Sequence, residues 1–242
     1  MRTMAVFKPP TEGEPTTLVL ASQSTGRLKT LRGAGVWPTV IVSDVDEDEV
    51  LAKYSADTEP KTVVTMLALA KAEAVAERIE QGDPSMITAL NAAGNDQVLV
   101  VGADSMLHLD GQLVGKPHTP EVATERIKQM RGKDGVLWTG HGLVKLVRVG
   151  ESFEIEREAA QATSAVVHFG DMTDAEIDAY VATGEPLEVA GSFTIDALGG
   201  PFIEGITGDH HGVVGISLPL LRKMGMKLGV SWPQLWEGNP QP

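Results

Sequence analysis

The sequence predicts an α/β fold. Short apolar runs that are typical of strands alternate with stretches of helical periodicity, which is the pattern of α/β proteins. Two long alternating segments, residues 137–149 and 151–169, predict an antiparallel pair of strands that turns at Gly150. With 242 residues, the chain is long enough to bury a sizeable core.

The first part of the chain predicts a leader followed by short strands. Residues 1–15 contain three prolines, one glycine and two glutamates, and this composition predicts a disordered leader. Apolar runs predict strands at 17–21, 40–42, 98–101 and 106–109. The last of these runs is followed by Asp110-Gly111, a two-residue hairpin signal.

Helix signals occur between the strands and after them. Helices are expected after a polar turn at 22–26, over about 61–79, from Thr119 to about Arg131, from Thr173, and over 217–224. Thr119-Pro120 supplies an N-cap followed by a first-turn proline, and Thr173 with Glu176 forms a capping box. Residues 81–96 are expected to be a loop insertion, and residues 227–242 a peripheral tail.

Charge and composition exclude several classes of protein. The net charge is −13, from 33 acidic and 20 basic residues, so the surface repels nucleic acid and anionic membranes. The chain has no cysteine, which excludes disulfides, a thiolate nucleophile and a cysteine zinc site. No signal-peptide core or run of membrane-spanning length is present, and a cytoplasmic protein is the expectation.

The most informative stretch is residues 98–117. A buried strand is expected to end at Gly102-Ala103, which places Asp104 at its carboxyl end, where open α/β sheets bind ligands. The hairpin at Asp110-Gly111 then returns the chain to Lys116. One carboxylate and one ammonium are thereby brought to one end of a small sheet, which suits a metal and a polyphosphate.

Three other segments carry candidate chemistry, each with a plainer alternative. The Ser-rich turn before Arg27 could bind an anion at a helix start, or could be an N-cap turn with a solvated arginine. The acidic cluster at 44–49 could hold Mg²⁺ or Mn²⁺, or could be a solvated loop. Lys71 lies on the apolar stripe of its helix and either faces a cleft or extends to solvent. The six histidines form no metal-binding pattern, and no Walker-type loop is present.

Together these segments resemble the Maf family, the septum-formation-inhibitor-like nucleoside triphosphate pyrophosphatases. The resemblance extends from about Leu18 to Leu221. It is carried by LASQSTGR, DVDED, ALAKAEA, VGADS, DGQLVGKP, GHGLV, EIDAYVATGEPLEVAGSF and GDHHGVVGISLPLL. It implies a Maf/ITPase-like α/β fold, with a mixed twisted sheet flanked by helices, and a single catalytic domain over 16–226 with two lobes and a deep central cleft.

The resemblance also implies an activity and a set of site residues. The activity is metal-dependent hydrolysis of nucleoside triphosphates to monophosphate and pyrophosphate, linked to removal of noncanonical or modified nucleotides and to cell-division arrest. A homodimer is implied as well. Asp104 matches the proton acceptor, and Glu47 with Asp104 would bind Mg²⁺ or Mn²⁺. The residues that match triphosphate contacts are Ser22, Ser24, Arg27, Lys71 and Lys116.

The sequence departs from the family at the positions that discriminate between bases. Gly26, Ser105 and Asp196 stand where the pyrimidine-cleaving group has Arg, Thr and Gln, and the 7-methyl-GTP group has Trp, Gln and Glu. This is neither set, so base preference cannot be transferred from either group. Because a carboxylate only accepts hydrogen bonds, Asp196 favours guanine-like bases over those of UTP and dTTP. Thr25 also replaces the usual proline of the turn.

Two other functions remain open from the sequence. The chain could be a regulatory protein that acts by binding a cell-division partner, which only the unusual Gly26, Ser105 and Asp196 triplet favours. It could also be a metal phosphohydrolase that releases orthophosphate. Product analysis separates these alternatives, since they predict no turnover and orthophosphate, respectively, rather than pyrophosphate.

Overall fold

A single mixed sheet organises the protein. The computed structural model describes residues 13–55 and 57–241, so most of the predicted leader, 1–15, lies outside the described residues. Within that part of the chain the sheet has seven strands in the order β2-β1-β3-β5-β6-β7, and β4 pairs with β3. β1 is parallel to β2 and β3, whereas the other pairs are antiparallel. The α/β fold and its mixed sheet are therefore confirmed.

The strands agree in part with the predicted runs: β3 joins two of them, 98–101 and 106–109, and β7 was not predicted. The strands are β1 (Thr16–Leu20), β2 (Thr39–Val40), β3 (Gln97–Leu109), β4 (Gln112–Val114), β5 (Asp134–Val149), β6 (Ser152–Phe169) and β7 (Ile203–Gly208). The hairpin at Asp110-Gly111 and the turn at Gly150 are both present, with positive φ at all three residues. β3 does not end at Gly102, as predicted, but continues to Leu109.

Five of the helices in the described ranges correspond to the predicted ones. The helices are α1 (Thr25–Gly33), α2 (Glu47–Leu51), α3 (Pro60–Glu80), α4 (Pro84–Ala93), α5 (Pro120–Met130), α6 (Asp174–Ala182), α7 (His210–Val214), α8 (Leu218–Lys227) and α9 (Trp232–Gly238). Of these, α2, α4, α7 and α9 were not predicted. Three short 3-10 helices, η1 (Glu185–Glu188), η2 (Ala190–Ser192) and η3 (Gly200–Phe202), lie between α6 and β7. Thr119 caps α5, and Thr173 and Glu176 form the capping box of α6. None of the helices in the described ranges has the length and apolar content needed to cross a membrane.

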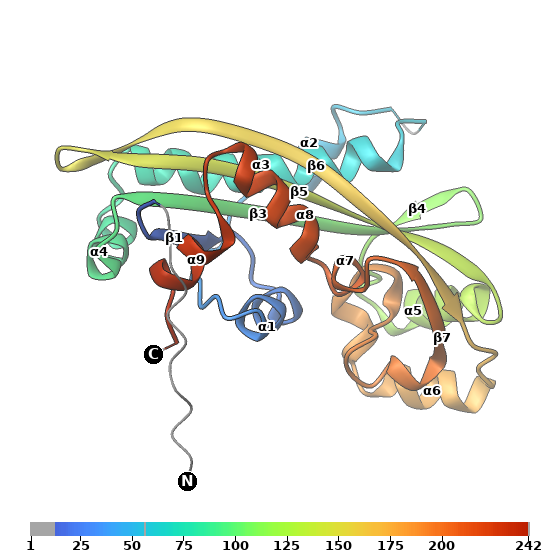
Figure 1. Cartoon of the computed structure of the whole chain (residues 1–242). Helices are drawn as coiled ribbons and strands as arrows, with labels where there is room; N and C mark the ends of the chain where they lie inside the picture. The colour runs from blue at the N-terminus through green and yellow to red at the C-terminus, as the bar shows by residue number, and fades with distance from the viewer. Residues whose placement is uncertain (1–12, 56, 242) are drawn as a thin grey trace, which may run out of the picture.

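The long helix α3 lies directly on the sheet (Figure 1). Glycines on β3 and β5 permit this close approach. A Cβ atom at Gly140 would lie 1.9 Å from the Val64 carbonyl oxygen, and one at Gly102 would lie 2.2 Å from that of Ala68. Gly102 therefore accommodates a helix rather than ending a strand, which is the physical reason for the wrong boundary in β3.

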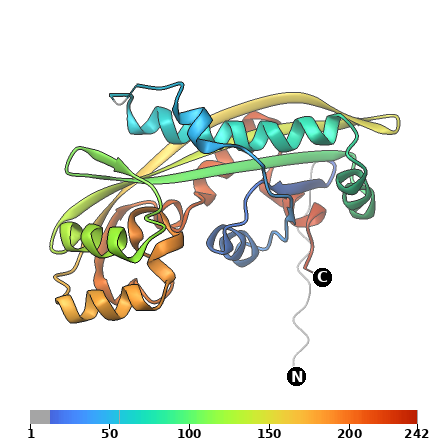
Figure 2. The same cartoon turned by 180° about the vertical axis from the view of Figure 1, so that it is seen from behind.

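Two groups of elements lie at opposite ends of the long strands. β1, β2, α1, α4 and α9 gather at one end, and α5, α6 and β7 at the other (Figures 1 and 2). Each group has its own buried apolar cluster: Leu18, Leu20 and Leu235 belong to one, and Ile127 and Ile177 to the other. This arrangement agrees with the two expected lobes, while the deep cleft between them remains an expectation.

The predictions for two segments, residues 81–96 and 227–242, are wrong. Residues 81–96 contain α4, which Asp83 caps and Gly94 ends at φ 74°, so the Asp-Pro and Gly signals marked a helix. The tail at 227–242 is not peripheral, because α9 packs on β1 and buries Leu235. Asn239 accepts a hydrogen bond from Leu18 N at 2.7 Å and donates to Thr16 O at 2.9 Å. The tail thus completes the sheet edge beside β1.

Candidate active site

The candidate site lies at a break in the strand pairing of β3. The parallel ladder with β1 ends at the Leu20–Val101 pair, and pairing with β4 begins only at Leu107. Residues 102–106, here called the β3 gap, therefore pair with β5 on one side and with no described strand on the other. Asp104 is thus in the middle of a strand, not at its end, yet it lies just beyond the end of the parallel ladder.

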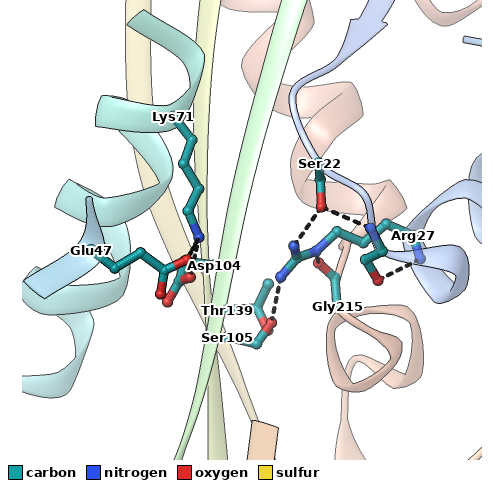
Figure 3. A network of polar contacts seen from close by, with 9 residues as sticks. Ser22, Arg27, Glu47, Lys71, Asp104, Ser105, Thr139 and Gly215 are labelled. Carbon is teal, nitrogen blue, oxygen red and sulfur yellow. Dashed lines mark hydrogen bonds and ion pairs between the residues drawn. The ribbon is translucent and has the colours of Figure 1, made fainter. Parts of the chain in front are cut away.

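Neighbouring side chains in the β3 gap serve opposite faces of the sheet, because strand side chains alternate. Asp104 points toward α3, and Ser105 points toward α1 and α7 (Figure 3). Gly140, opposite Asp104, faces α3 in the same way, and Thr139 lies opposite Ser105. The gap thereby presents two different polar clusters, one on each side of β3.

The first cluster joins two carboxylates through one lysine. The Lys71 Nζ atom on α3 lies 2.6 Å from Asp104 Oδ1 and 2.7 Å from Glu47 Oε1 (Figure 3). Lys71 and Asp104 are buried, whereas about half of the Glu47 side chain is exposed at the start of α2. Of the two alternatives left open for Lys71, extension to solvent is wrong, because its side chain is buried and contacts both acids that the family resemblance suggested as metal ligands.

Burial and neighbouring charges give Asp104 and Glu47 different proton affinities. Burial raises the pKa of Asp104 above its ordinary value, and the charge and hydrogen bond of Lys71 oppose this rise only in part. Burial acts in the same direction on Glu47, but Lys71, with the charges of Lys116 and Arg27, outweighs it and lowers the Glu47 pKa. Asp104 is therefore the better proton acceptor of the pair. Its Oδ2 atom is buried and has no hydrogen-bond partner among the described residues.

The second cluster is built around Arg27 at the start of α1. Its guanidinium donates to Gly215 O at 2.9 Å, to Ser22 Oγ at 2.9 Å and to Ser105 Oγ at 3.4 Å (Figure 3). Burial lowers the pKa of Arg27, while the charges of Asp104 and Glu47 raise it. An arginine remains protonated in proteins, so a fixed positive charge faces the carboxylates across the β3 gap.

The Ser-rich turn is both a cap and a part of this cluster. The Ser24 side chain caps α1 by accepting from Arg27 N at 3.4 Å, and Ser22 Oγ accepts from Ser24 N at 3.2 Å. The plain N-cap interpretation is thus correct for Ser24. The alternative of a solvated Arg27 is wrong, because three of its N–H groups are bound within the protein.

The remaining predicted residues are less closely joined to these clusters. Lys116 is exposed after β4 and forms no ion pair in the described parts of the chain, but its charge lowers the Glu47 pKa. Gly26 lies against α7, where a Cβ atom would meet Val214 at 3.4 Å. Asp196 is exposed between η2 and η3, and no hydrogen bond or ion pair links it to the described residues. The structure therefore brings together seven predicted residues around the gap: Ser22, Ser24, Arg27, Glu47, Lys71, Asp104 and Ser105.

Sequence reasoning missed the residues that support Arg27 from β5 and α7. Thr139 Oγ1 lies 2.9 Å from Ser105 Oγ and donates to Gly212 O at 2.8 Å. Gly215 supplies the carbonyl that binds Arg27 Nε. These contacts span 34 to 188 residues along the chain, so no local pattern in the sequence signals them.

The two carboxylates fit a divalent cation. They converge on the position of one positive group, Lys71 Nζ, and Asp104 Oδ2 is left without a partner in the described structure. Oxygen ligands of this kind suit Mg²⁺ or Mn²⁺, which keep several water or phosphate ligands. Groups of three or more metal-binding side chains do not occur among the described residues, so Glu47 and Asp104 would share the ion with substrate and water oxygens.

The fold and this site define a class: α/β proteins in which a buried carboxylate–lysine pair faces an arginine across a break in the sheet. Residues 17–228 match the sequence profile described as Maf-like protein. The chain belongs to this family, which confirms the resemblance found in the sequence.

Three related proteins are similar in sequence to this chain over almost their whole length. A protein of Nocardia farcinica is 50% identical over 220 residues, which cover 91% of this chain and 96% of the relative. One from Mycobacterium sp. strain JLS is 48% identical over 221 residues, covering 91% and 98%. One from Mycobacterium marinum is 44% identical over 227 residues, covering 94% and 100%. Each of the three is named nucleoside triphosphate pyrophosphatase.

Proposed function

We propose that this chain hydrolyses nucleoside triphosphates to nucleoside monophosphate and pyrophosphate, with a divalent metal at Glu47 and Asp104. The observation that carries the proposal is the contact of Lys71 Nζ with both carboxylates, with Asp104 Oδ2 left unpartnered opposite Arg27. The names of relatives that are 44 to 50% identical support the same activity.

In the proposed reaction Asp104 accepts a proton from the attacking water. The oxygen of that water bonds to the α-phosphorus, the bond from this phosphorus to the bridging oxygen breaks, and its electron pair leaves with pyrophosphate. The raised pKa of Asp104 suits a proton acceptor, and Oδ2 offers a free lone pair for it. A bound Mg²⁺ or Mn²⁺ would neutralise charge on the phosphates. Asp104 serves as base, as metal ligand, or as both.

The cations around the gap would hold the triphosphate. Arg27, Lys71 and Lys116 supply positive charge in a chain whose net charge is −13, so binding depends on this local concentration of cations. Contacts to the β- and γ-phosphates would make pyrophosphate a bound leaving group. Such contacts are strongest when the donors are held in position before the reaction, and three hydrogen bonds within the protein already hold Arg27.

Product analysis tests the proposal. The purified chain is incubated with unmodified and modified nucleoside triphosphates and Mg²⁺ or Mn²⁺, and pyrophosphate, orthophosphate and monophosphate are quantified. We expect pyrophosphate and monophosphate in equal amounts, and no turnover after chelation of the metal. Orthophosphate as the main product would indicate a general phosphohydrolase. Absence of turnover with every substrate would favour a regulatory protein that acts by binding.

We further propose that Asp196 reads the base. A carboxylate can accept two hydrogen bonds from a guanine edge, but only one from the N3–H of uracil or thymine. Asp196→Gln adds a donor and one methylene, so the preference should shift from GTP and 7-methyl-GTP toward UTP. The ratio of kcat/KM values in the two proteins measures this shift. An unchanged ratio would show that Asp196, which is exposed in this structure, does not contact the base.

A further inference from the structure

Arg27 is held by three of its five N–H groups. Nε donates to Gly215 O, Nη1 to Ser22 Oγ, and Nη2 to Ser105 Oγ. A guanidinium has five N–H groups in a fixed planar arrangement, so two remain for a ligand. The direction of those two groups is set by whatever fixes the other three.

The contact between Arg27 and Ser105 belongs to a chain of hydrogen bonds with a defined direction. Thr139 Oγ1 donates its one proton to Gly212 O at 2.8 Å, because a carbonyl oxygen can only accept. In the 2.9 Å contact between the two hydroxyls, Ser105 must therefore donate to Thr139. The Ser105 oxygen is then an acceptor for Arg27 Nη2. The chain runs from Arg27 through Ser105 and Thr139 to α7.

Thr139 has no substitute for this interaction. It is 1% exposed, so bulk water cannot replace its hydroxyl. α7 and its C-cap residue supply both ends of the support, because Gly212 in α7 anchors Thr139 and the C-cap Gly215 binds Arg27 directly. Loss of the Thr139 hydroxyl would leave the Gly212 carbonyl without this donor and would free the Ser105 side chain to rotate away from Arg27.

We propose that Thr139 is a positioning residue, which orients Arg27 toward the phosphates of the substrate through Ser105. This inference rests on the proposed pyrophosphatase function. It also changes the role of Ser105, because the Ser105 proton is committed to Thr139 and cannot be donated to a base. Ser105 acts through Arg27, so its removal should affect substrates with different bases equally.

The test compares Thr139→Val, which removes the hydroxyl, with Thr139→Ser, which keeps it. Pyrophosphate release should show a loss of about tenfold in kcat/KM for Thr139→Val, mostly as a higher KM, since the phosphates bind before the reaction. Thr139→Ser should recover most of this loss. Thr17→Val is the matched control, because Thr17 is also 1% exposed and its hydroxyl binds only Asn95 among the described side chains, away from Arg27. It should change thermal stability but not KM.

A double-mutant cycle with Arg27→Lys separates positioning from a purely structural effect. If Thr139 acts through Arg27, then Thr139→Val should cause less than a twofold further loss in the Arg27→Lys protein. A further tenfold loss of kcat/KM in the Arg27→Lys protein would overturn the inference. A Thr139→Val protein that folds and keeps the wild-type KM would overturn it as well. A wild-type chain that releases no pyrophosphate would instead overturn the proposed function.

Ser105→Ala provides the second variant if Thr139→Val does not fold, since it breaks the same chain at a less buried residue. It should raise the KM for GTP and UTP by the same factor. A change for one base only would show that Ser105 reads the base, and would overturn the inference.

Discussion

Asp104 and Ser105 show how a single step along a strand separates two tasks. The Asp104 carboxylate contacts Lys71 on the α3 side, whereas the Ser105 hydroxyl contacts Arg27 on the other side. A shift of one residue in the register of β3 would exchange these faces and separate both pairs. The twelve ladder pairs between β3 and β5, from Gln97–Val147 to His108–Val136, fix that register without a bulge.

Asp104→Asn should abolish turnover and leave the fold intact. The two side chains are nearly isosteric, but the amide is neither a base nor a strong metal ligand, so we expect a loss of about a thousandfold or more. Pyrophosphate release and thermal unfolding measure the two effects. Asp110→Asn is the matched control, because Asp110 is exposed in the hairpin at φ 47°, where asparagine is tolerated. More than about a tenth of wild-type activity in Asp104→Asn would refute the assignment.

Lys116→Ala should impair triphosphates more than diphosphates. Lys116 acts on Glu47 by its charge without forming an ion pair in the described structure, so it is available to a phosphate. A nucleoside diphosphate lacks the γ-phosphate and should lose less binding energy. The ratio of kcat/KM for GTP and GDP is the measurement, with Lys128→Ala, an exposed lysine on α5, as control. Equal losses on both substrates would contradict the phosphate-clamp role of Lys116.

At the scale of elements, the predictions that are confirmed rest on local signals, although the local cap signals of α4 at Asp83-Pro84 and Gly94 were taken for a loop. The caps at Thr119 and Thr173 and the Asp110-Gly111 hairpin depend on residues within a few positions, so the sequence predicts them. The predicted strand end at Gly102 was wrong because a glycine is needed there for a distant reason. The Ala68 carbonyl of α3 leaves no room for a Cβ atom at this position.

The same division applies to the candidate site. Asp104 and Lys116 stand out in the sequence because one short stretch contains both. The roles expected for Glu47 and Ser22 came from the family resemblance rather than from spacing. Thr139 carried no signal, since its partners Ser105 and Gly212 are 34 and 73 residues away. Positioning residues of this kind become visible only when the sheet is assembled.

His141 joins two elements and should make their association sensitive to pH. Its Nε2 accepts from Ser217 N, the cap residue of α8, at 2.8 Å. Burial, together with the Arg27 charge, lowers the pKa of His141 to about 4 from its ordinary 6.5. Between these values the unfolded chain binds the proton and the folded chain does not. The contribution of neutral His141 to the free energy of unfolding should therefore be fully present above pH 6.5. It should decrease by about 3 kcal/mol as the pH falls to 4.

Urea unfolding at a series of pH values tests this dependence against His141→Gln. The glutamine amide oxygen can still accept from Ser217 N but does not titrate, so the difference between the two proteins isolates the His141 contribution. Wild type should lose more stability than His141→Gln between pH 6.5 and 4. Parallel curves for the two proteins would show that His141 is not buried as a neutral group.

At the scale of the whole molecule, the two ends of the described chain meet at one edge of the sheet. α9 packs beside β1, and Gln234 donates to Glu14 O at 2.9 Å. β1 in turn leads directly into Ser22 and Arg27. The C-terminal segment therefore supports the strand from which half of the candidate site is built, although it contributes no side chain to the site (Figure 1).

A chain that ends at Gly229 should be much less stable than the full chain. It loses the apolar contacts of Leu235, which is 3% exposed, and the hydrogen bond from Trp236 Nε1 to Ala34 O. It also loses Asn239, which binds both Leu18 N and Thr16 O on β1. These losses amount to about 4 kcal/mol, from one buried leucine and these three hydrogen bonds. The melting temperature should fall by about 10 °C, since 1 kcal/mol corresponds to about 2–4 °C in a protein of this size.

Differential scanning calorimetry of the full chain and three variants tests this expectation. A chain that ends at Pro240 is the control for shortening itself, because it keeps α9 and Asn239 and lacks only the last two residues. Asn239→Ala should be intermediate, with a loss of about 1–3 kcal/mol from the unpaired backbone groups of β1. If the chain ending at Gly229 melted within about 2 °C of the full chain, α9 would be dispensable, and β1 would owe its position to β2 and β3 alone. The larger shift would instead show that stability at the Arg27 side of the site depends on residues more than 200 positions away, as the contact between Leu18 and Asn239 indicates.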